Sequence, residues 1–130
     1  MAYSDFLKQQ CYIDGKWCDA DSGATIDVTD PGSGKKLGTI PRMGTDETRR
    51  AIAAAEAALP AWRAKPAGER ARLMRRLFDL MMEHQDSLGE LLSREQGKPF
   101  AEAKGEVAYG AGFIEWFAEE GKRAYGDVIP

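Results

Sequence analysis

Residues 99–123, PFAEAKGEVAYGAGFIEWFAEEGKR, decide how this chain must fold. Pro99 suits the opening of a helix, because the first turn does not need the N–H that proline lacks. The residues that follow predict one continuous helix to about Arg123. At the standard rise this helix is roughly 35 Å long, which is long for a chain of 130 residues.

The predicted helix is apolar on two sides. One stripe consists of small and aliphatic residues that allow close backbone approach, and the other stripe is aromatic. The residues of the first stripe are Val107, Gly110, Ala111, Ile114 and Ala118, and those of the second are Tyr109, Phe113, Trp116 and Phe117. Because one small domain cannot readily cover both stripes, we expect the chain to be the opening segment of a larger protein. We also expect the isolated chain to self-associate through this helix.

Three shorter helices are predicted before this one. Thr45 can cap the first of them, and Pro60 is expected to stop it. The second begins near Pro66 and carries a broad apolar face at helical spacing. The third covers about residues 86–96, and the Gly97 that follows is typical of a C-terminal stop.

Two short hairpins are predicted before the helices. Asp14-Gly15 supplies the two positive φ values of a type I′ turn, which places Tyr12 opposite Trp17. A second strand pair is predicted at residues 25–29 and 36–40, which proline and glycine breakers separate. The fold class is therefore α+β, with N-terminal β-hairpins followed by about four helices. Nothing in residues 1–130 indicates an internal domain boundary.

The two cysteines, Cys11 and Cys18, are too few to staple a secreted scaffold and have no histidine nearby to complete a zinc site. The predicted hairpin places them directly opposite each other, so a cross-strand disulfide is conceivable on distance alone. The N-terminus is too polar for a signal peptide, which indicates a cytoplasmic protein. Reduced thiols are the expectation in that compartment.

Composition excludes several classes of function. The 18 basic and 21 acidic residues give a net charge of -3 without a basic tract, which argues against a nucleic-acid partner. No apolar run is long enough to span a membrane. His84 is the only histidine and lies at the border of an apolar helix face, which favours a structural role over a catalytic triad. Gly110-Ala111-Gly112 lies inside a predicted helix and not after a strand, so it is not a dinucleotide-binding loop.

Several segments, in this order, resemble the N-terminal stretch of the aldehyde dehydrogenase superfamily. They are residues 12–17 (YIDGKW), Asp30-Pro31 with Gly34, Ala61-Trp62 and residues 95–99 (EQGKP). Residues 102–107, 113–123 and 125–130 are similar to the bacterial NADP-dependent members that oxidise succinate semialdehyde. The resemblance covers nearly the whole chain.

The resemblance implies that the parent protein oxidises an aldehyde to a carboxylate with NADP or NAD as the cofactor. In the family, a cysteine thiolate attacks the aldehyde, and a glutamate-activated water releases the product. Nucleophile, base and nucleotide loop lie well after residue 130, so Cys11 and Cys18 are not their counterparts. The resemblance implies that residues 1–130 are the first, incomplete part of an α/β Rossmann-type coenzyme-binding domain, and that the chain alone is inactive. A small-molecule aldehyde substrate and a homo-oligomer are implied for the parent protein.

Two lesser features of the family can be placed on this sequence. Some members bind a monovalent cation at positions that match the backbone carbonyls of Val28 and Thr29 and the acid Glu95. Here glutamate replaces the more usual aspartate, and a glutamate in the last turn of a helix without a cation is the alternative. Tyr109 matches a position that borders the substrate tunnel in some members, with packing in the core as its alternative.

A second, non-catalytic interpretation competes with the enzyme. In this interpretation the chain is a small helical module that uses the aromatic stripe of its last helix to bind a partner. The two interpretations differ in what the coding sequence contains after Pro130. A glycine-rich nucleotide loop and a cysteine nucleophile there would favour the enzyme.

Overall fold

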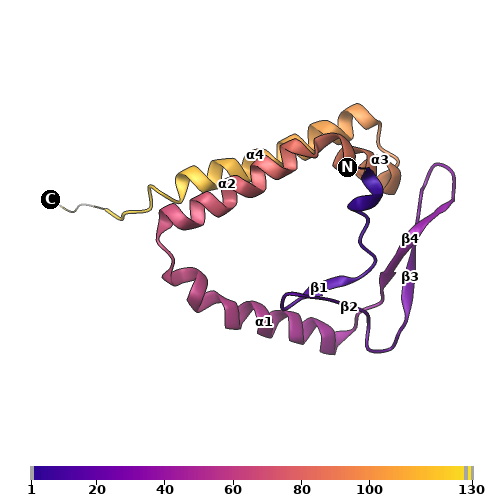
Figure 1. The fold of residues 1–130 in the computed structure, drawn as a ribbon, viewed down its shortest axis with the longest axis horizontal. Helices are drawn as coiled ribbons and strands as arrows, with labels where there is room; N and C mark the ends of the chain where they lie inside the picture. Colours follow the sequence, from indigo (N-terminus) through magenta and orange to yellow (C-terminus); the bar gives the residue numbers. More distant parts are fainter. Residues whose placement is uncertain (1, 128, 130) are drawn as a thin grey trace.

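The computed structural model describes residues 2–127 and 129 and arranges them as an open frame (Figure 1). The β1–β2 hairpin and the first helix form one side of the frame, the β3–β4 hairpin closes one end, and the other three helices form the opposite side. The elements are the 3-10 turn Tyr3–Asp5, β1 (Cys11–Ile13), β2 (Lys16–Cys18), β3 (Thr25–Thr29), β4 (Lys36–Pro41), α1 (Thr45–Ala64), α2 (Ala67–Glu83), α3 (Gln85–Gln96) and α4 (Phe100–Glu120). Hairpins followed by four helices confirm the predicted α+β class.

Both hairpins have the predicted strands. β1 and β2 pair antiparallel, with Tyr12 opposite Trp17, around a turn in which Asp14 and Gly15 have φ values of 51° and 75°. These values are those of the predicted type I′ turn. β3 and β4 form a separate two-stranded sheet, in which Ile26 faces Ile40 and a register shift falls between Val28 and Thr29. The described residues contain no parallel sheet.

The helix boundaries differ from the prediction at three points. Gly44, and not Thr45, caps α1, because the side chain of Glu47 accepts a hydrogen bond from the backbone N–H of Gly44 at 3.0 Å. Pro60 does not stop α1, which continues to Ala64. Proline removes one backbone hydrogen bond, and Pro60 is solvent-exposed, so water can satisfy the carbonyl that is left.

α4 ends at Glu120, before the predicted boundary at Arg123. After Gly121, the N–H groups of Lys122 and Arg123 bond the carbonyls of residues three before them, which is a tightened turn and no longer an α-helix. The 21 residues of α4 still span about 31 Å at the standard rise. None of the described helices is both long enough and apolar enough to cross a membrane.

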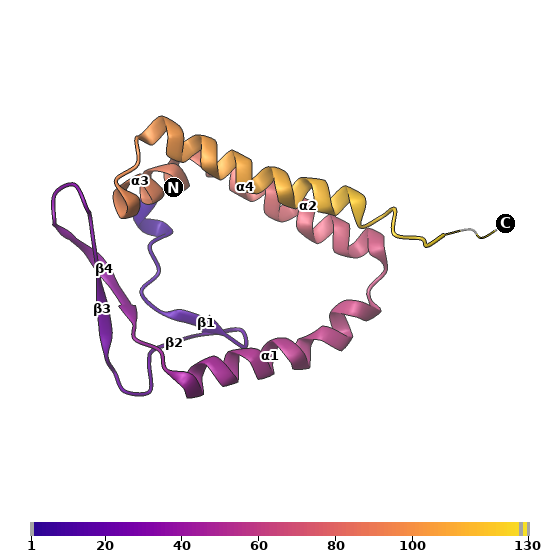
Figure 2. The same ribbon diagram turned by 180° about the vertical axis from the view of Figure 1, so that it is seen from behind.

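α4 packs along α2 and α3 through its small-residue stripe (Figures 1 and 2). Ala103 and Ala111 are completely buried, and Ala118 is 1% exposed. Small side chains let the helix backbones approach closely, but they bury little area each. Among the described residues no large apolar side chain is fully buried. The α2–α3–α4 layer is therefore closely packed and thin.

α1 lies apart from this layer. It packs on β1 and has almost no contact with the other three helices (Figure 2). Large apolar side chains of α1 and α2 remain about half exposed. Among them are Ile52, Leu59, Leu73 and Leu77. The amphipathic face predicted for α2 is thus only partly covered by this chain.

Candidate functional site

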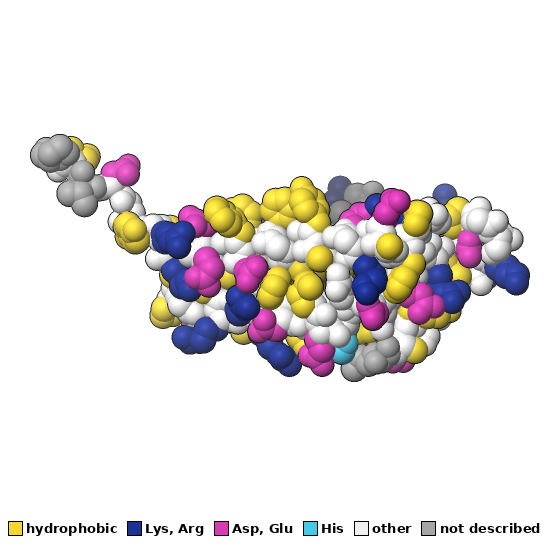
Figure 3. Space-filling view, turned by 90° about the horizontal axis from the view of Figure 1, so that it is seen from above, with side chains coloured by type: hydrophobic (Ala, Val, Ile, Leu, Met, Phe, Trp, Pro, Cys, Tyr) yellow, Lys and Arg dark blue, Asp and Glu magenta, His cyan; other side chains and the backbone are white. Residues whose placement is uncertain are grey.

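The aromatic stripe of α4 is an exposed apolar surface of the helical layer. Tyr109 is 70% exposed, Trp116 63%, Phe117 57% and Phe113 49%. Figure 3 shows hydrophobic side chains gathered along this layer, with charged side chains around them. The chain therefore covers one stripe of α4 and leaves the other open, as the two-sided pattern in the sequence predicted.

Helical spacing alone produces this division. Tyr109, Phe113 and Trp116 recur at intervals of four and three residues and so share one face. The buried stripe has the same periodicity and occupies another face, where Ala111 and Ala118 contact the neighbouring helices. The two faces therefore differ in side-chain size, since the positions buried deepest against α2 and α3 are alanines.

The aromatic side chains border a shallow groove of about 440 Å³. Its lining residues are Ala108, Tyr109, Gly112, Phe113, Trp116 and Phe117. The ring of Tyr109 meets that of Phe113 edge to face, with centroids 4.9 Å apart. This arrangement is favourable for aromatic pairs. The groove can bind apolar surface, but its lining contains no nucleophile, carboxylate or imidazole.

Charged residues beside the groove are paired with each other. Arg75 on α2 contacts Glu115 on α4 at 2.7 Å, and its guanidinium also lies over the ring of Phe78. At the end of α4, the hydrogen bond from the Lys122 ammonium lowers the pKa of Glu119 below its ordinary value. Each of these pairs brings opposite charges together near the groove.

The residues predicted to hold a monovalent cation lie on segments that touch. Val28 and Thr29 are on β3, and the turn after them packs against the end of α3, where a Cβ at Gly97 would be 3.0 Å from Cγ of Pro31. Glu95 is exposed in the last turn of α3. The register shift between Val28 and Thr29 interrupts the regular hydrogen-bond ladder of the hairpin. A backbone carbonyl at such an interruption can bind a group outside the ladder.

His84 and the two cysteines are not part of this groove. His84 is half-buried between α2 and α3, and its ring lies 5.2 Å from that of Phe6, which fits the structural role predicted for it. Cys11 and Cys18 are free thiols on the hairpin. No group of three or more histidine, cysteine or acidic side chains among the described residues is arranged to hold a metal.

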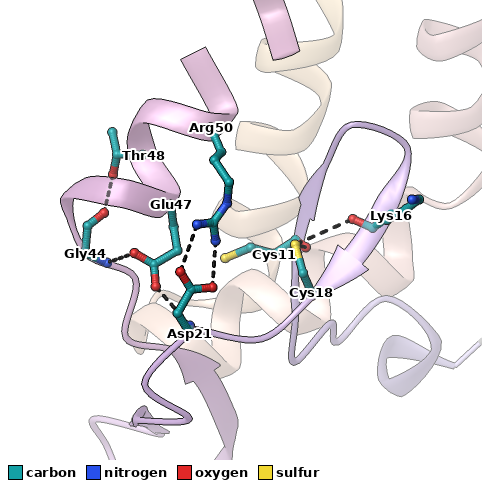
Figure 4. Close-up of polar contacts among 8 residues, drawn as sticks. All are labelled: Cys11, Lys16, Cys18, Asp21, Gly44, Glu47, Thr48 and Arg50. Atoms are coloured by element: carbon teal, nitrogen blue, oxygen red, sulfur yellow. Dashed lines mark hydrogen bonds and ion pairs between the residues drawn. The ribbon is translucent and has the colours of Figure 1, made fainter. Parts of the chain in front are cut away.

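The junction between the first hairpin and α1 was not foreseen from the sequence (Figure 4). The buried carboxylate of Glu47 accepts hydrogen bonds from the backbone N–H groups of Asp21 and Gly44, each at 3.0 Å. These bonds and that from its own N–H hold the pKa of Glu47 below the ordinary value. Arg50 adds a bidentate pair with Asp21 at 2.7 and 2.8 Å. The signal available in the sequence was an acidic residue in the first turn of a predicted helix, where the helix dipole favours it.

Gly89 was also missed, although it sets the distance between α3 and α4. A Cβ at Gly89 would lie 2.8 Å from Cγ of Lys104 and 3.2 Å from the Cα and N of the same residue. Such an approach is possible only for glycine unless the helices separate. The available signal was a single glycine in the interior of a predicted helix, which often marks close packing.

The comparison with known proteins identifies the class to which this protein belongs. The aldehyde dehydrogenase family profile matches residues 17–130, which is most of the chain. The chain therefore belongs to the aldehyde dehydrogenase family, and the resemblance predicted from the sequence motifs is confirmed.

Individual relatives make the comparison more specific. The chain is 63% identical, over 98% of its length, to the NADP(+)-dependent succinate-semialdehyde dehydrogenase GabD of Escherichia coli. It is 62% identical, over 98% of its length, to glutarate-semialdehyde dehydrogenase of Pseudomonas putida. The crystal structure of an NADP-dependent enzyme of E. coli superimposes with a TM-score of 0.95, at 63% identity over 98% of this chain.

The chain spans about a quarter of the length of these relatives, since it covers 26% of each. The superposition nevertheless includes nearly all of its residues, so the open frame is the same shape that this segment has in a much longer enzyme. The segment has little core of its own and still has the shape of the matching segment in the longer enzyme. This is expected of a segment that makes its remaining contacts with other parts of a larger protein.

Proposed function

We propose that this chain serves as the N-terminal part of the coenzyme-binding domain in an NAD(P)-dependent aldehyde dehydrogenase. The identity of 63% to the E. coli relative over nearly the whole chain is the observation that carries the proposal. The open frame supports it, because α1 and the aromatic stripe of α4 expose apolar surface that a larger protein would cover. A cytoplasmic homo-oligomer that acts on a small aldehyde is part of the same proposal.

The substrate class that we propose is a short aldehyde with a carboxylate at its far end. Two of the similar curated proteins act, by their names, on succinate semialdehyde and on glutarate semialdehyde. These molecules share an aldehyde at one end and a carboxylate at the other, and they differ by one methylene. Since one methylene changes binding by only about 1–3 kcal/mol, we propose succinate semialdehyde as the main substrate with glutarate semialdehyde as a close competitor.

The coenzyme is assigned to the whole enzyme and to no residue of this chain. Gly110 and Gly112 lie inside α4, and the glycines near residue 33 lie in the β3–β4 turn, so neither group is a phosphate-binding loop. When bound, the nicotinamide accepts hydride from the substrate. The described residues contribute shape and support, and no chemical step of the reaction is placed on them.

Tyr109 is the residue of this chain that we propose to border the substrate tunnel. It is the most exposed member of the aromatic stripe, and its edge-to-face contact with Phe113 holds the ring in place. An apolar wall at this point would guide the methylene chain of a semialdehyde while other residues bind its carboxylate. Val28, Thr29 and Glu95 are proposed as ligands of a monovalent cation that joins β3 to the end of α3.

A chimera tests the function. The first 26% of the E. coli relative would be replaced by this chain, and NADPH formation would be measured with succinate semialdehyde, glutarate semialdehyde and an uncharged aldehyde such as butanal. We expect an active chimera that prefers the two carboxylate-bearing substrates. Tyr109→Ala in the chimera should raise the KM for both, with Tyr12→Ala, an exposed tyrosine on the hairpin, as the control.

Two outcomes would contradict the proposal. One is a chimera that assembles to the same size as the E. coli enzyme and has no activity with any of the aldehydes. The other is an active chimera that prefers butanal. That result would contradict the proposed substrate class and would leave the family assignment unchanged. Size-exclusion chromatography before the assay separates failure to assemble from failure to react.

A further inference from the structure

The hairpin places two thiols directly opposite each other. Cys11 and Cys18 are partners in the register of β1 and β2. Partners in antiparallel strands have Cα atoms about 4.5 to 5.5 Å apart. A disulfide joins residues whose Cα atoms are about 4.4 to 6.8 Å apart. The backbone of the hairpin therefore already has the separation that a Cys11–Cys18 bridge requires.

The turn and the neighbouring pair hold this register. Asp14 and Gly15 both have positive φ, which only a few residue types adopt without strain, and they close the hairpin with two residues. Beside the cysteines, Tyr12 and Trp17 lie across the strands with ring centroids 5.1 Å apart. A slip by one residue would separate this aromatic pair and move every side chain to the opposite face. The two thiols thus stay facing partners while the hairpin is folded.

The thiols are reachable from solvent. Both cysteines are half-buried and free, and Cys18 lines an open groove between the hairpin and α1 that also contains Asp21 and Arg50 (Figure 4). The thiol of Cys18 donates a weak hydrogen bond to the carbonyl of Cys11 at 3.3 Å. Rotation about one side-chain bond releases this contact, so the hydrogen bond does not lock the Cys18 thiol in place.

We propose that Cys11 and Cys18 form an oxidisable dithiol that closes to an intramolecular disulfide by exchange with a low-molecular-weight disulfide such as glutathione disulfide. One cysteine thiolate attacks a glutathione sulfur, which forms a mixed disulfide and releases one glutathione thiolate. The second cysteine thiolate attacks the protein sulfur, forms the Cys11–Cys18 bond and releases the second glutathione. Two electrons pass from the cysteine pair to the glutathione disulfide, and the two thiol protons end on the two glutathione molecules.

The bridge would fasten a hairpin whose strands are only three residues long each. Short two-stranded hairpins open readily in water, and a cross-link suppresses this opening. Because β1 is the element on which α1 packs, the oxidised chain should also hold α1 more firmly. Closure of the disulfide depends on the hairpin alone and does not require dehydrogenase activity.

The test is a redox titration of the full 130-residue chain. The chain is equilibrated in glutathione buffers, quenched with acid, alkylated and analysed by intact mass and peptide mapping. We expect an oxidised species that has lost two hydrogens, carries no alkyl group and links the Cys11 peptide to the Cys18 peptide. We also expect the effective concentration of the two thiols to be about tenfold or more higher in buffer than in urea, because the folded hairpin has already ordered the loop.

Single substitutions test the accessibility of the thiols and the effect of the folded hairpin separately. Cys11→Ser and Cys18→Ser should each take up one glutathione, which shows that either thiol is accessible. Gly15→Val, which forces a side chain into a positive φ, should lower the effective concentration toward the urea value. Glutathione adducts without a bridge in the wild type, equal effective concentrations in buffer and urea, or a single-cysteine variant that takes up no glutathione would each overturn the proposal.

Discussion

At the residue scale, Gly89 controls the contact of α3 with α4. We expect Gly89→Ala to destabilise the chain by about 1–2 kcal/mol, because the cost of overpacking against the Lys104 backbone exceeds the gain from a more rigid helix. Gly105→Ala is the matched control, since a Cβ there meets nothing within 4 Å. That variant should gain up to about 1 kcal/mol. Urea unfolding monitored by circular dichroism measures both, and an equal gain in the two variants would contradict the close approach.

Glu47 should make the stability depend on pH in the acid range. Its pKa lies below the ordinary value of 4.5 because backbone N–H groups donate to the carboxylate, so the folded state favours the charged form. The stabilisation is therefore complete above about pH 4.5 and is lost as the pH falls through the lowered pKa. We expect Glu47→Gln to lower Tm at neutral pH and to approach the wild-type Tm in acid.

The control for this prediction is Glu56→Gln, which removes an exposed carboxylate from the same helix. It should leave the difference between neutral and acid Tm nearly unchanged, since exposed charges contribute little. A Glu47→Gln chain whose Tm differs from wild type by the same amount at both pH values would show that the carboxylate charge is not what stabilises the junction.

At the element scale, helix and hairpin positions could be predicted from the sequence, and their exact ends could not. The Asp14-Gly15 turn and the two stripes of α4 follow from short-range rules that depend on neighbouring residues alone. Two helix ends differ from the prediction, since α1 continues past Pro60 and α4 ends before Gly121. An exposed proline costs one hydrogen bond without ending a helix, and a glycine can end one without adopting a left-handed conformation.

The contacts between elements were not predictable in the same way. Glu47 bonds Asp21, which is 26 residues away, and Gly89 meets Lys104 on the next helix. Such contacts depend on how elements pack, which periodicity does not specify. For the candidate site, sequence indicated which residues of α4 form the aromatic stripe. It could not indicate that Tyr109 would be the most exposed of them.

At the scale of the whole molecule, the described residues form a frame with little core of its own. Among the described residues, the buried apolar ones are alanines, and the lining of the aromatic groove contains no catalytic group. We therefore expect the purified 130-residue chain to form no NADPH from succinate semialdehyde and NADP. Absorbance at the NADPH band, with the E. coli relative as the positive control, measures this, and turnover that co-purifies with the chain would contradict it.

The exposed stripe of α4 also predicts how the isolated chain behaves in solution. Its aromatic side chains need cover, and the most abundant apolar surface available to a purified chain is a second copy. A symmetric dimer that buries about 800 Å² per chain would be stable. Replacing Phe113 and Trp116 together with glutamine should shift the chain toward monomer and keep its helix content, because the buried alanine stripe holds the helical layer.

Sedimentation equilibrium of the wild-type chain tests most directly whether α4 is covered on one side only. We predict a dimer at micromolar concentration, a monomer for the Phe113→Gln, Trp116→Gln variant, and a dimer for the control Ile52→Gln, Leu59→Gln, which changes exposed apolar residues on α1. A wild-type chain that stays monomeric at high micromolar concentration, with the aromatic side chains protected from solvent, would show that the chain covers both stripes itself and would contradict this account.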